Sequence, residues 1–248
     1  MILNEQTILV TGGAGSIGTF LASEFYGRCR KVIVVDKDEE KLNQLKTRFQ
    51  GIEIYTCDLT DGAKVAETVA SIFKKHVVSV LINNAGFIHS EPLINILKPG
   101  DKKHSYAQWD ATIKANLYTT FYMSVNTAEQ MVAQRVKGVI INISSISAKG
   151  NMGQTAYAAA KAGIEAMTVT WAKELGIFGI RSAAIAPGFF DTASTRDSLS
   201  EANLKKWTKA VPLNRLGSLQ ELSSAANFII ENDYYNGQTL EINGGLKI

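Results

Sequence analysis

Short apolar runs alternate with helical patterns along the chain, and this alternation constrains the fold more than any other feature. The apolar runs are rich in Val and Ile, which is typical of strands that are covered on both faces of a sheet. Segments of about ten residues or more with helical spacing separate them, as in βαβ units. The expected strands are residues 7–10, 31–35, 52–55, 77–82, 138–143, 181–185 and 239–242, and the expected helices are 17–26, 39–49, 63–75, 109–134, 156–175 and 219–230.

This pattern predicts an α/β fold, a doubly wound parallel sheet (Rossmann fold) of three layers. No proline-rich or charged linker and no repeat of fixed period divides the chain, so we expect a single domain over residues 1–248. With 46% hydrophobic and 20% charged residues, the chain can bury a large core, which excludes a disordered protein.

Charge and cysteine content exclude several kinds of partner. The net charge is +3 and the lysines are scattered in short pairs, so we expect no nucleic-acid partner. No apolar run approaches the ~20 residues of a membrane helix, and no secretory signal is evident, so we expect no membrane contact. Cys29 and Cys57 give neither a disulfide framework nor a zinc spacing, which favours a reducing, cytoplasmic location. The three histidines are isolated, and we predict no metal.

A glycine-rich turn links the first expected strand to the first helix. Gly12, Gly15 and Gly18 suit a tight turn that a diphosphate approaches closely, and the N–H groups near Ser16 and Ile17 at the helix start favour phosphate. An ordinary βα turn is the alternative. The strand before the turn and the helix after it favour a dinucleotide.

Two acidic residues follow the next two strands. Asp36 ends the second strand, where a carboxylate accepts both hydroxyls of an adenosine ribose and repels a 2′-phosphate. This favours NAD, although Lys37 leaves NADP possible. Asp58 is placed to accept from an adenine amino group, but a helix cap explains it equally well.

Tyr157 and Lys161 share one helix face at i and i+4. Free tyrosine has a pKa of about 10, and a nearby ammonium lowers it, so that the phenol can exchange a proton with a hydroxyl or ketone. A serine close by, Ser144 or Ser145, can hold the substrate oxygen. Without further motifs, a Tyr and a Lys at this spacing more often form a pair on the exposed surface of a helix.

Taken together, these motifs resemble the short-chain dehydrogenase/reductase family over almost the whole chain. The resemblance rests on motifs in the right order rather than on one of them. They are the Thr11–Gly18 turn, Asp58, Asn83-Asn84-Ala85-Gly86, Asn116, Ser145, Tyr157 with Lys161, Pro187-Gly188 with Thr192, Asn236-Gly237-Gln238 and Asn243-Gly244-Gly245.

The resemblance implies specific roles. Tyr157 would be the general acid/base, with Lys161 lowering its pKa and binding the nicotinamide ribose, and with Ser145 orienting the substrate oxygen. Asn116 would help hold a water in a relay to Lys161. The other cofactor-binding positions implied are Leu59 with Asp58, Asn84 by the ribose, the Phe190 backbone and Thr192. The resemblance also implies a homotetramer through the helices around 109–134 and 156–175.

The chain departs from the family pattern in four places. Ser16 replaces a common glycine, and Ala183 replaces a common Asn. Ser145 lies 12 residues before Tyr157, one fewer than is usual, so counting back selects Ser144 whereas strand alignment selects Ser145. Residues 87–108 form a longer loop than in compact members. That loop either covers the substrate or is a mobile surface loop. Residues 189–211, with Leu199 and Trp207, form either an amphipathic lid over the substrate or a segment that simply packs on the fold.

We therefore expect an NAD-dependent oxidoreductase that interconverts a secondary alcohol and a ketone. The first alternative is a 3-oxoacyl-carrier-protein reductase that uses NADPH, against which Asp36 and Phe178 argue, since a basic residue is common near position 178 in that group. A sugar-nucleotide-modifying enzyme rests only on the Gly15-Ser16 spacing. A non-catalytic dinucleotide sensor or scaffold is the alternative of another class, disfavoured by the intact Ser145, Tyr157, Lys161 and Asn116.

Overall fold

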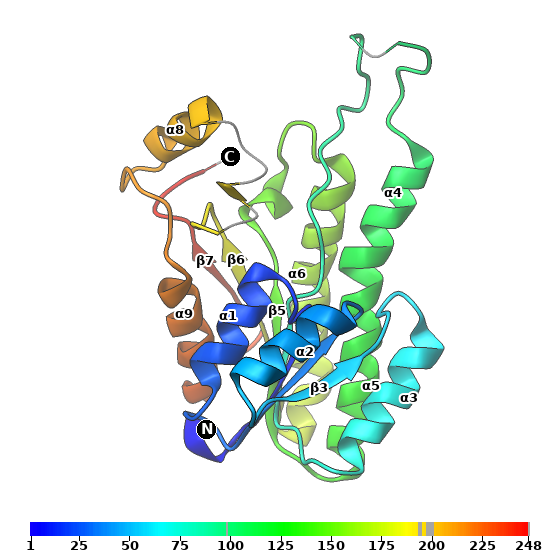
Figure 1. Cartoon of the computed structure of the whole chain (residues 1–248), viewed down its shortest axis with the longest axis vertical. Coiled ribbons are helices and arrows are strands. Elements are labelled where there is room, and N and C mark those ends of the chain that lie inside the picture. Colours follow the sequence, from blue (N-terminus) through cyan, green and yellow to red (C-terminus); the bar gives the residue numbers. More distant parts are fainter. Residues whose placement is uncertain (98, 193–194, 197–200, 248) are drawn as a thin grey trace.

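The computed structural model describes residues 1–97, 99–192, 195–196 and 201–247. Within these residues, a parallel sheet of seven strands in the order β3-β2-β1-β4-β5-β6-β7 forms the centre. Helices flank it on both faces (Figure 1), which confirms the doubly wound α/β fold. The strands are β1 (Thr7–Thr11), β2 (Lys31–Asp36), β3 (Glu53–Thr56), β4 (Val80–Asn83), β5 (Gly138–Ile143), β6 (Ile180–Pro187) and β7 (Thr239–Ile242).

Each face of the sheet is covered by its own apolar layer. Phe25, Leu42 and Ile229 bring α1, α2 and α9 against one face, and Val69 and Met123 bring α3 and α5 against the other. The helices are α1 (Ser16–Phe25), α2 (Glu39–Arg48), α3 (Gly62–Phe73), α4 (Tyr106–Ile113), α5 (Thr119–Ala133), α6 (Thr155–Leu175), α8 (Glu201–Ala210) and α9 (Leu219–Glu231), with the short turns η1 (Leu3–Glu5), η2 (Lys114–Tyr118), η3 (Ile146–Lys149) and η4 (Gly176–Phe178).

Two expected elements differ from the structure. The helix expected at 109–134 begins earlier, because Ser105 Oγ accepts from the Gln108 N–H and caps α4. A wider π turn, η2, then interrupts it before α5. The strand expected at 77–82 starts at Val80, three residues later than expected. The bounds of the other predicted elements differ by about two residues or fewer, within the usual spread of helix and strand ends.

The strand order places a crevice at one end of the sheet. β1 lies between β2 and β4, so the chain leaves neighbouring strands β1 and β4 in opposite directions. Ligands of doubly wound sheets bind outside the carboxyl ends of strands at such a point. The glycine turn after β1 and the Asn84 loop after β4 lie at this edge.

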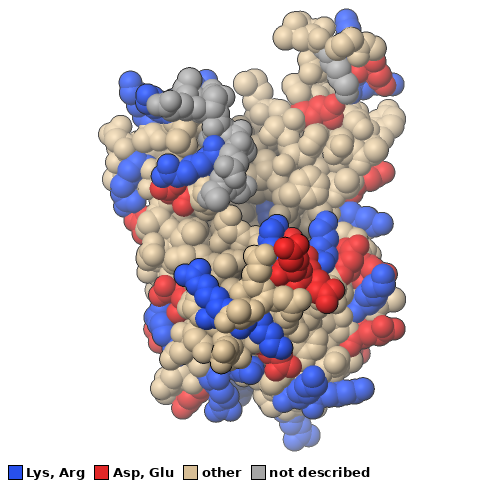
Figure 2. All heavy atoms as spheres, viewed as in Figure 1, with Lys and Arg blue, Asp and Glu red and all other residues tan. Residues whose placement is uncertain are grey.

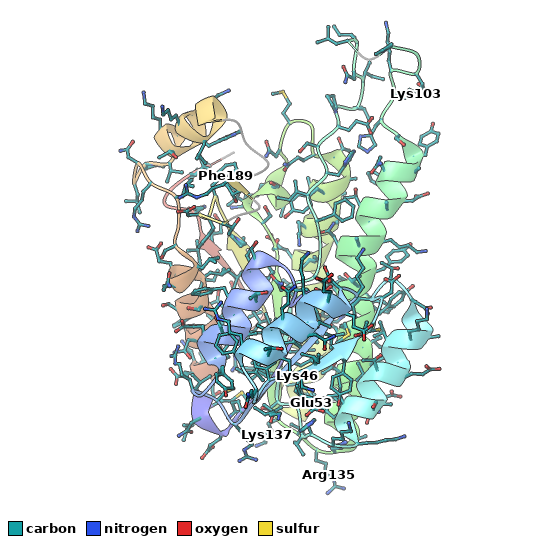
Figure 3. The ribbon with its side chains drawn as sticks, viewed as in Figure 1. Lys46, Glu53, Lys103, Arg135, Lys137 and Phe189 are labelled. Carbon is teal, nitrogen blue, oxygen red and sulfur yellow. The ribbon has the colours of Figure 1, made fainter. Side chains whose placement is uncertain are left out.

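The long loop after β4 forms an arm, defined here as residues 87–105 with residue 98 outside the described ranges. Two backbone bonds, from Asn95 N to Lys102 O (2.7 Å) and from His104 N to Leu93 O (2.9 Å), make its outer part a hairpin. The hairpin projects beyond the carboxyl edge of the sheet (Figure 1), and Lys103 lies on it (Figure 3). In the second expected substrate segment, the Phe189 and Trp207 rings stack with centroids 4.7 Å apart, whereas Leu199 falls outside the described residues.

Candidate active site

Thr11 and Asn84 hold the loop after β1 against the loop after β4. The Thr11 hydroxyl accepts from the N–H groups of Asn84 (3.0 Å) and Ala85 (3.1 Å), and the Asn84 amide donates to the carbonyls of Thr11 (3.0 Å) and Gly12 (3.1 Å). Gly12 has φ of +65°, and a Cβ there would lie 2.7 Å from Ala85 Cα. The predicted site residue Asn84 therefore shapes the glycine turn. The part that Thr11 plays in holding this turn was not predicted from the sequence.

The start of α1 offers an open phosphate site. Gly15 is the N-cap residue without a side-chain cap, and both Gly15 and Ser16 are exposed. First-turn N–H groups have no partner within a helix, and the helix dipole favours an anion there. A Cβ on Gly15 would meet only Gly12 O, at 3.4 Å, whereas one on Gly18 would lie 2.2 Å from that oxygen. Gly18 thus packs the helix on the turn, with Ile17 half-buried, and the turn fits the diphosphate of a dinucleotide.

Asp36 closes the same site from β2. Its Oδ2 accepts from the Ala14 N–H of the glycine turn at 3.0 Å, and its Oδ1 accepts from the Asp38 N–H at 3.1 Å. The half-buried carboxylate is therefore fixed beside the glycine turn. Lys37 is exposed and lines a neighbouring cavity of about 450 Å³ together with Asp58 and Lys64.

Asp58 has a local partner in the next turn. Its Oδ1 accepts from the Thr60 N–H (3.0 Å) and hydroxyl (2.8 Å), and these bonds lower the pKa of its exposed carboxyl group. Asp58 does not cap α3, because Asp61 accepts from the N–H groups of Ala63 and Lys64 there. Leu59 is buried in the core between them.

Tyr157 and Lys161 lie on the buried face of α6, 7% and 4% exposed. The Lys161 Nζ donates to the Ile143 carbonyl at 2.8 Å and lies 5.5 Å from the Tyr157 ring centroid. Burial raises the pKa of Tyr157 to about 12, with an opposing hydrogen bond to Ser145, and burial lowers the pKa of Lys161 to about 8. The pKa of Tyr157 thus differs from the lowered value expected, because desolvation dominates and the ammonium points to the end of β5.

The two candidate serines point to different partners. The Ser145 hydroxyl lowers the pKa of Tyr157 against the effect of burial, and its Oγ accepts from the Ser147 N–H at 3.1 Å. Ser144 is 2% exposed, and its hydroxyl donates to Glu165 Oε1 at 2.8 Å. The geometry therefore joins Ser145, and not Ser144, to Tyr157.

Asn116 is fully buried in the π turn η2. Its side-chain amide donates to the carbonyls of Thr112 (2.9 Å) and Phe87 (3.0 Å), and its backbone carbonyl accepts from the Thr120 hydroxyl at 2.9 Å. A Cβ on Gly86 would lie 2.3 Å from Asn116 Oδ1, so the glycine permits the contact. Asn116 consequently links the α4–α5 helical segment to the beginning of the arm.

The segment after β6 reaches the same edge of the sheet. Phe190 is 4% exposed and pairs with Gly217, whose carbonyl accepts from Asp191 N at 2.8 Å. The Thr192 hydroxyl accepts from Thr195 N at 3.0 Å. These predicted residues follow β6 as Ser145 follows β5, and they bond to Gly217 and Thr195.

Phe178 lies at the opposite edge of the sheet from Tyr157. It ends η4 directly before β6, where Gly138 N donates to Gly179 O at 3.2 Å. Figure 3 shows Lys137 at the end of the molecule opposite Phe189. Within one chain, residue 178 therefore lies at the edge of the sheet opposite the Tyr157 site.

Three further features concern the described residues as a group. Within the described ranges, no helix combines the length and the apolar character that a membrane crossing requires. The described part of the chain also holds no group of three or more His, Cys, Asp and Glu side chains suited to a metal ion. Figure 2 shows acidic and basic side chains intermixed over the face it presents.

Comparison with known proteins agrees with this geometry. Residues 6–223 match the family model for short chain dehydrogenases. A 3-oxoacyl-(acyl-carrier-protein) reductase FabG of Thermotoga maritima is 36% identical, with 100% of both chains covered. A sorbitol-6-phosphate 2-dehydrogenase of Klebsiella pneumoniae is 30% identical, with 98% of this chain and 96% of the relative covered.

Among solved structures, a gluconate 5-dehydrogenase of Burkholderia cenocepacia in complex with NADP and tartrate superposes with a TM-score of 0.88. It is 28% identical, and the match covers 98% of this chain and 96% of that one. The chain is a member of the short-chain dehydrogenase family, whose enzymes are oxidoreductases that use NAD(P) and act on CH–OH and keto groups.

Proposed function

We propose that the chain interconverts a secondary alcohol and a ketone with NAD(H), and that Tyr157 is the general acid/base. The observation that carries this proposal is the placement of Tyr157 and Lys161 together on the buried face of α6, with the Lys161 Nζ 5.5 Å from the Tyr157 ring centroid. These groups lie at the carboxyl edge of the sheet, beside the crevice that binds dinucleotides in this fold.

Each side chain has a defined task in ketone reduction. The nicotinamide supplies the hydride when bound. Tyr157, protonated at neutral pH because of its raised pKa, donates its proton to the ketone oxygen. Ser145 accepts from the Ser147 N–H, so its own proton is available to the same oxygen. Lys161, with a pKa near 8, is mostly charged at pH 7 and stabilises the phenolate that remains.

NAD(H) is the cofactor that Asp36 favours. The carboxylate is fixed by Ala14 and Asp38 beside the glycine turn and would repel a 2′-phosphate. NADP is the second candidate, supported by Lys37 and Lys64 in the adjoining cavity and by the NADP in the gluconate 5-dehydrogenase structure.

The substrate is proposed to be a small oxo compound held between the arm and the segment after β6. Beside the Ser145 turn, Ile146, Val211 and Leu246 form a small apolar cluster, and Phe189 packs on it. This wall, with several 3-oxoacyl-(acyl-carrier-protein) reductases among the relatives, makes a 3-oxoacyl thioester the second candidate substrate.

An activity assay that varies both the cofactor and the substrate class tests these proposals. Initial rates with NADH and NADPH are measured on 3-oxoacyl thioesters, simple ketones and keto-polyols. We expect turnover of at least one class with NADH preferred. Turnover of none with either cofactor, although both bind, would instead indicate a dinucleotide-binding scaffold.

Assembly and location complete the proposal. Tyr118, Phe121 and Val125 expose 43%, 44% and 48% of their surface at i, i+3 and i+7 along η2 and α5. This apolar stripe supports the predicted homotetramer.

A cytoplasmic location is proposed because NAD(H) is an intracellular cofactor, and Cys29 and Cys57 are both free.

A further inference from the structure

We propose that Gln154 is a positioning residue that sets the direction of the Ser145 hydroxyl and connects it to the arm. The inference rests on the proposed function, because it takes Ser145 and Tyr157 as the groups that meet the substrate oxygen. Gln154 itself is assigned no contact with the substrate.

Gln154 uses both ends of its side-chain amide. Its Oε1 accepts from the Ser147 hydroxyl (2.9 Å) and from Asn151 Nδ2 (3.1 Å), and its Nε2 donates to the Ser90 hydroxyl (3.3 Å). Gln154 lies directly before α6, three residues from Tyr157. One half-buried side chain therefore joins the arm, η3 and the start of the catalytic helix.

The bond to Ser147 leads to the catalytic serine. Ser147 is 5% exposed, and its N–H donates to Ser145 Oγ at 3.1 Å while its hydroxyl donates to Gln154. An Oγ that accepts this bond keeps its proton for another acceptor. If η3 shifted, Ser145 would lose the bond that orients it, and its proton would no longer be directed to the reacting oxygen.

The arm is attached at the same point. Glu91 N donates to the Gly153 carbonyl at 2.7 Å, and Glu91 and Gln154 form a parallel bridge. Ser90 adds the side-chain bond to Gln154. A displacement of the arm is thus transmitted through Gln154 to Ser147 and then to Ser145.

The test is a comparison of isosteric variants in ketone reduction. Gln154→Met keeps the side-chain length and removes both amide atoms, and we expect kcat to fall about 10- to 100-fold through misplacement of Ser145. KM and cofactor affinity should change much less. Gln154→Glu still accepts from Ser147 and should retain most of the kcat. Gln44→Met, on the exposed face of α2, is the matched control and should leave kcat unchanged.

A double-variant cycle separates positioning from general destabilisation. In a Ser145→Ala background, measured by single turnovers with excess enzyme, Gln154→Met should cause little further loss. An equal loss with and without Ser145, or an unchanged kcat in Gln154→Met, would overturn the proposal. Ser147→Ala, which removes the hydroxyl donor but keeps the N–H, should reproduce part of the loss and serves if Gln154→Met does not fold.

Failure of the role proposed for Gln154 can be distinguished from failure of the proposed function. Retained turnover in Tyr157→Phe would contradict the assignment of the acid/base itself. Loss of turnover in Tyr157→Phe and Ser145→Ala, together with a neutral Gln154→Met, would contradict only the role of Gln154.

Discussion

The Ser144 hydroxyl donates to Glu165 Oε1 at 2.8 Å, and it turns away from the Tyr157 side chain that its neighbour Ser145 meets. Successive side chains at the end of an extended strand point in opposite directions, so the two serines cannot exchange roles without a change of register. Between Ser145 and Tyr157 the chain forms the short turn η3 before α6 begins at Thr155.

Replacing these serines one at a time should separate catalysis from stability. Ser145→Ala should lower kcat about 100-fold, the scale of one lost oxyanion donor. Ser144→Ala should keep most of the activity and lower the free energy of unfolding by about 1 kcal/mol, since Glu165 loses a donor. Steady-state rates and urea denaturation check both values. The reverse pattern would assign the catalytic role to Ser144.

Tyr157→Phe should abolish turnover and leave NAD binding unchanged. The substitution removes the hydroxyl that donates the proton while the ring keeps its packing in the buried α6 face. Isothermal titration with NAD and rate measurements with the best ketone of the panel check the two halves separately. Turnover above about 1% of the wild-type rate would contradict the assignment. This threshold corresponds to an increase of about 3 kcal/mol in the activation free energy.

Asp36→Asn should relax the cofactor preference. Loss of the charge removes the repulsion of a 2′-phosphate, while the amide oxygen still accepts one backbone bond. We expect kcat/KM with NADPH to rise about tenfold relative to that with NADH, which corresponds to ~1.4 kcal/mol. Glu24→Gln, the same charge change at a half-buried site on α1 that pairs with Arg28, is the control. An unchanged ratio would show that Asp36 does not select the cofactor.

The sequence predicted the strands and the glycine turn because their signals are local. Thr11–Gly18 couples an apolar run, three glycines and a helix start within a few residues, and the structure keeps that order. The bounds of a strand such as β5 can be predicted because its apolar residues form a continuous run that is buried on both faces of the sheet.

The sequence patterns could not predict contacts between segments that lie far apart along the chain. That Asn84 clamps Thr11 and Gly12 depends on β1 and β4 being neighbours in the sheet. The pKa of Tyr157 depends on how deeply α6 is buried, which an i, i+4 spacing does not indicate. Gln154 carries no motif of its own, and only its three partners from different segments reveal it.

Lys161→Met should stabilise the fold at neutral pH while abolishing activity. Burial lowers the pKa of Lys161 from 10.5 to about 8, so below pH 8 the folded state bears the full cost of a buried ammonium. As the pH rises towards 10.5, the unfolded chain keeps the proton that the folded chain has lost, and the wild-type stability increases. The expected advantage of the variant is up to about 3 kcal/mol at pH 7 and shrinks as the pH rises.

Denaturation at pH 7 and pH 9.5 measures this difference. Lys64→Met, at an exposed position on α3, is the control and should show no such dependence on pH. A gap between Lys161→Met and wild type that stays constant from pH 7 to 9.5 would contradict a lowered pKa of Lys161.

Phe121→Glu should disrupt the assembly of subunits. Phe121 lies at the centre of the apolar stripe with Tyr118 and Val125, and a buried carboxylate without a partner opposes association. Sedimentation velocity should show a tetramer for the wild type and smaller species for Phe121→Glu. Val77→Glu, at an exposed apolar position outside the stripe, should remain tetrameric. A wild-type chain that sediments as a stable monomer, or an intact tetramer of Phe121→Glu, would show that this stripe is not the interface.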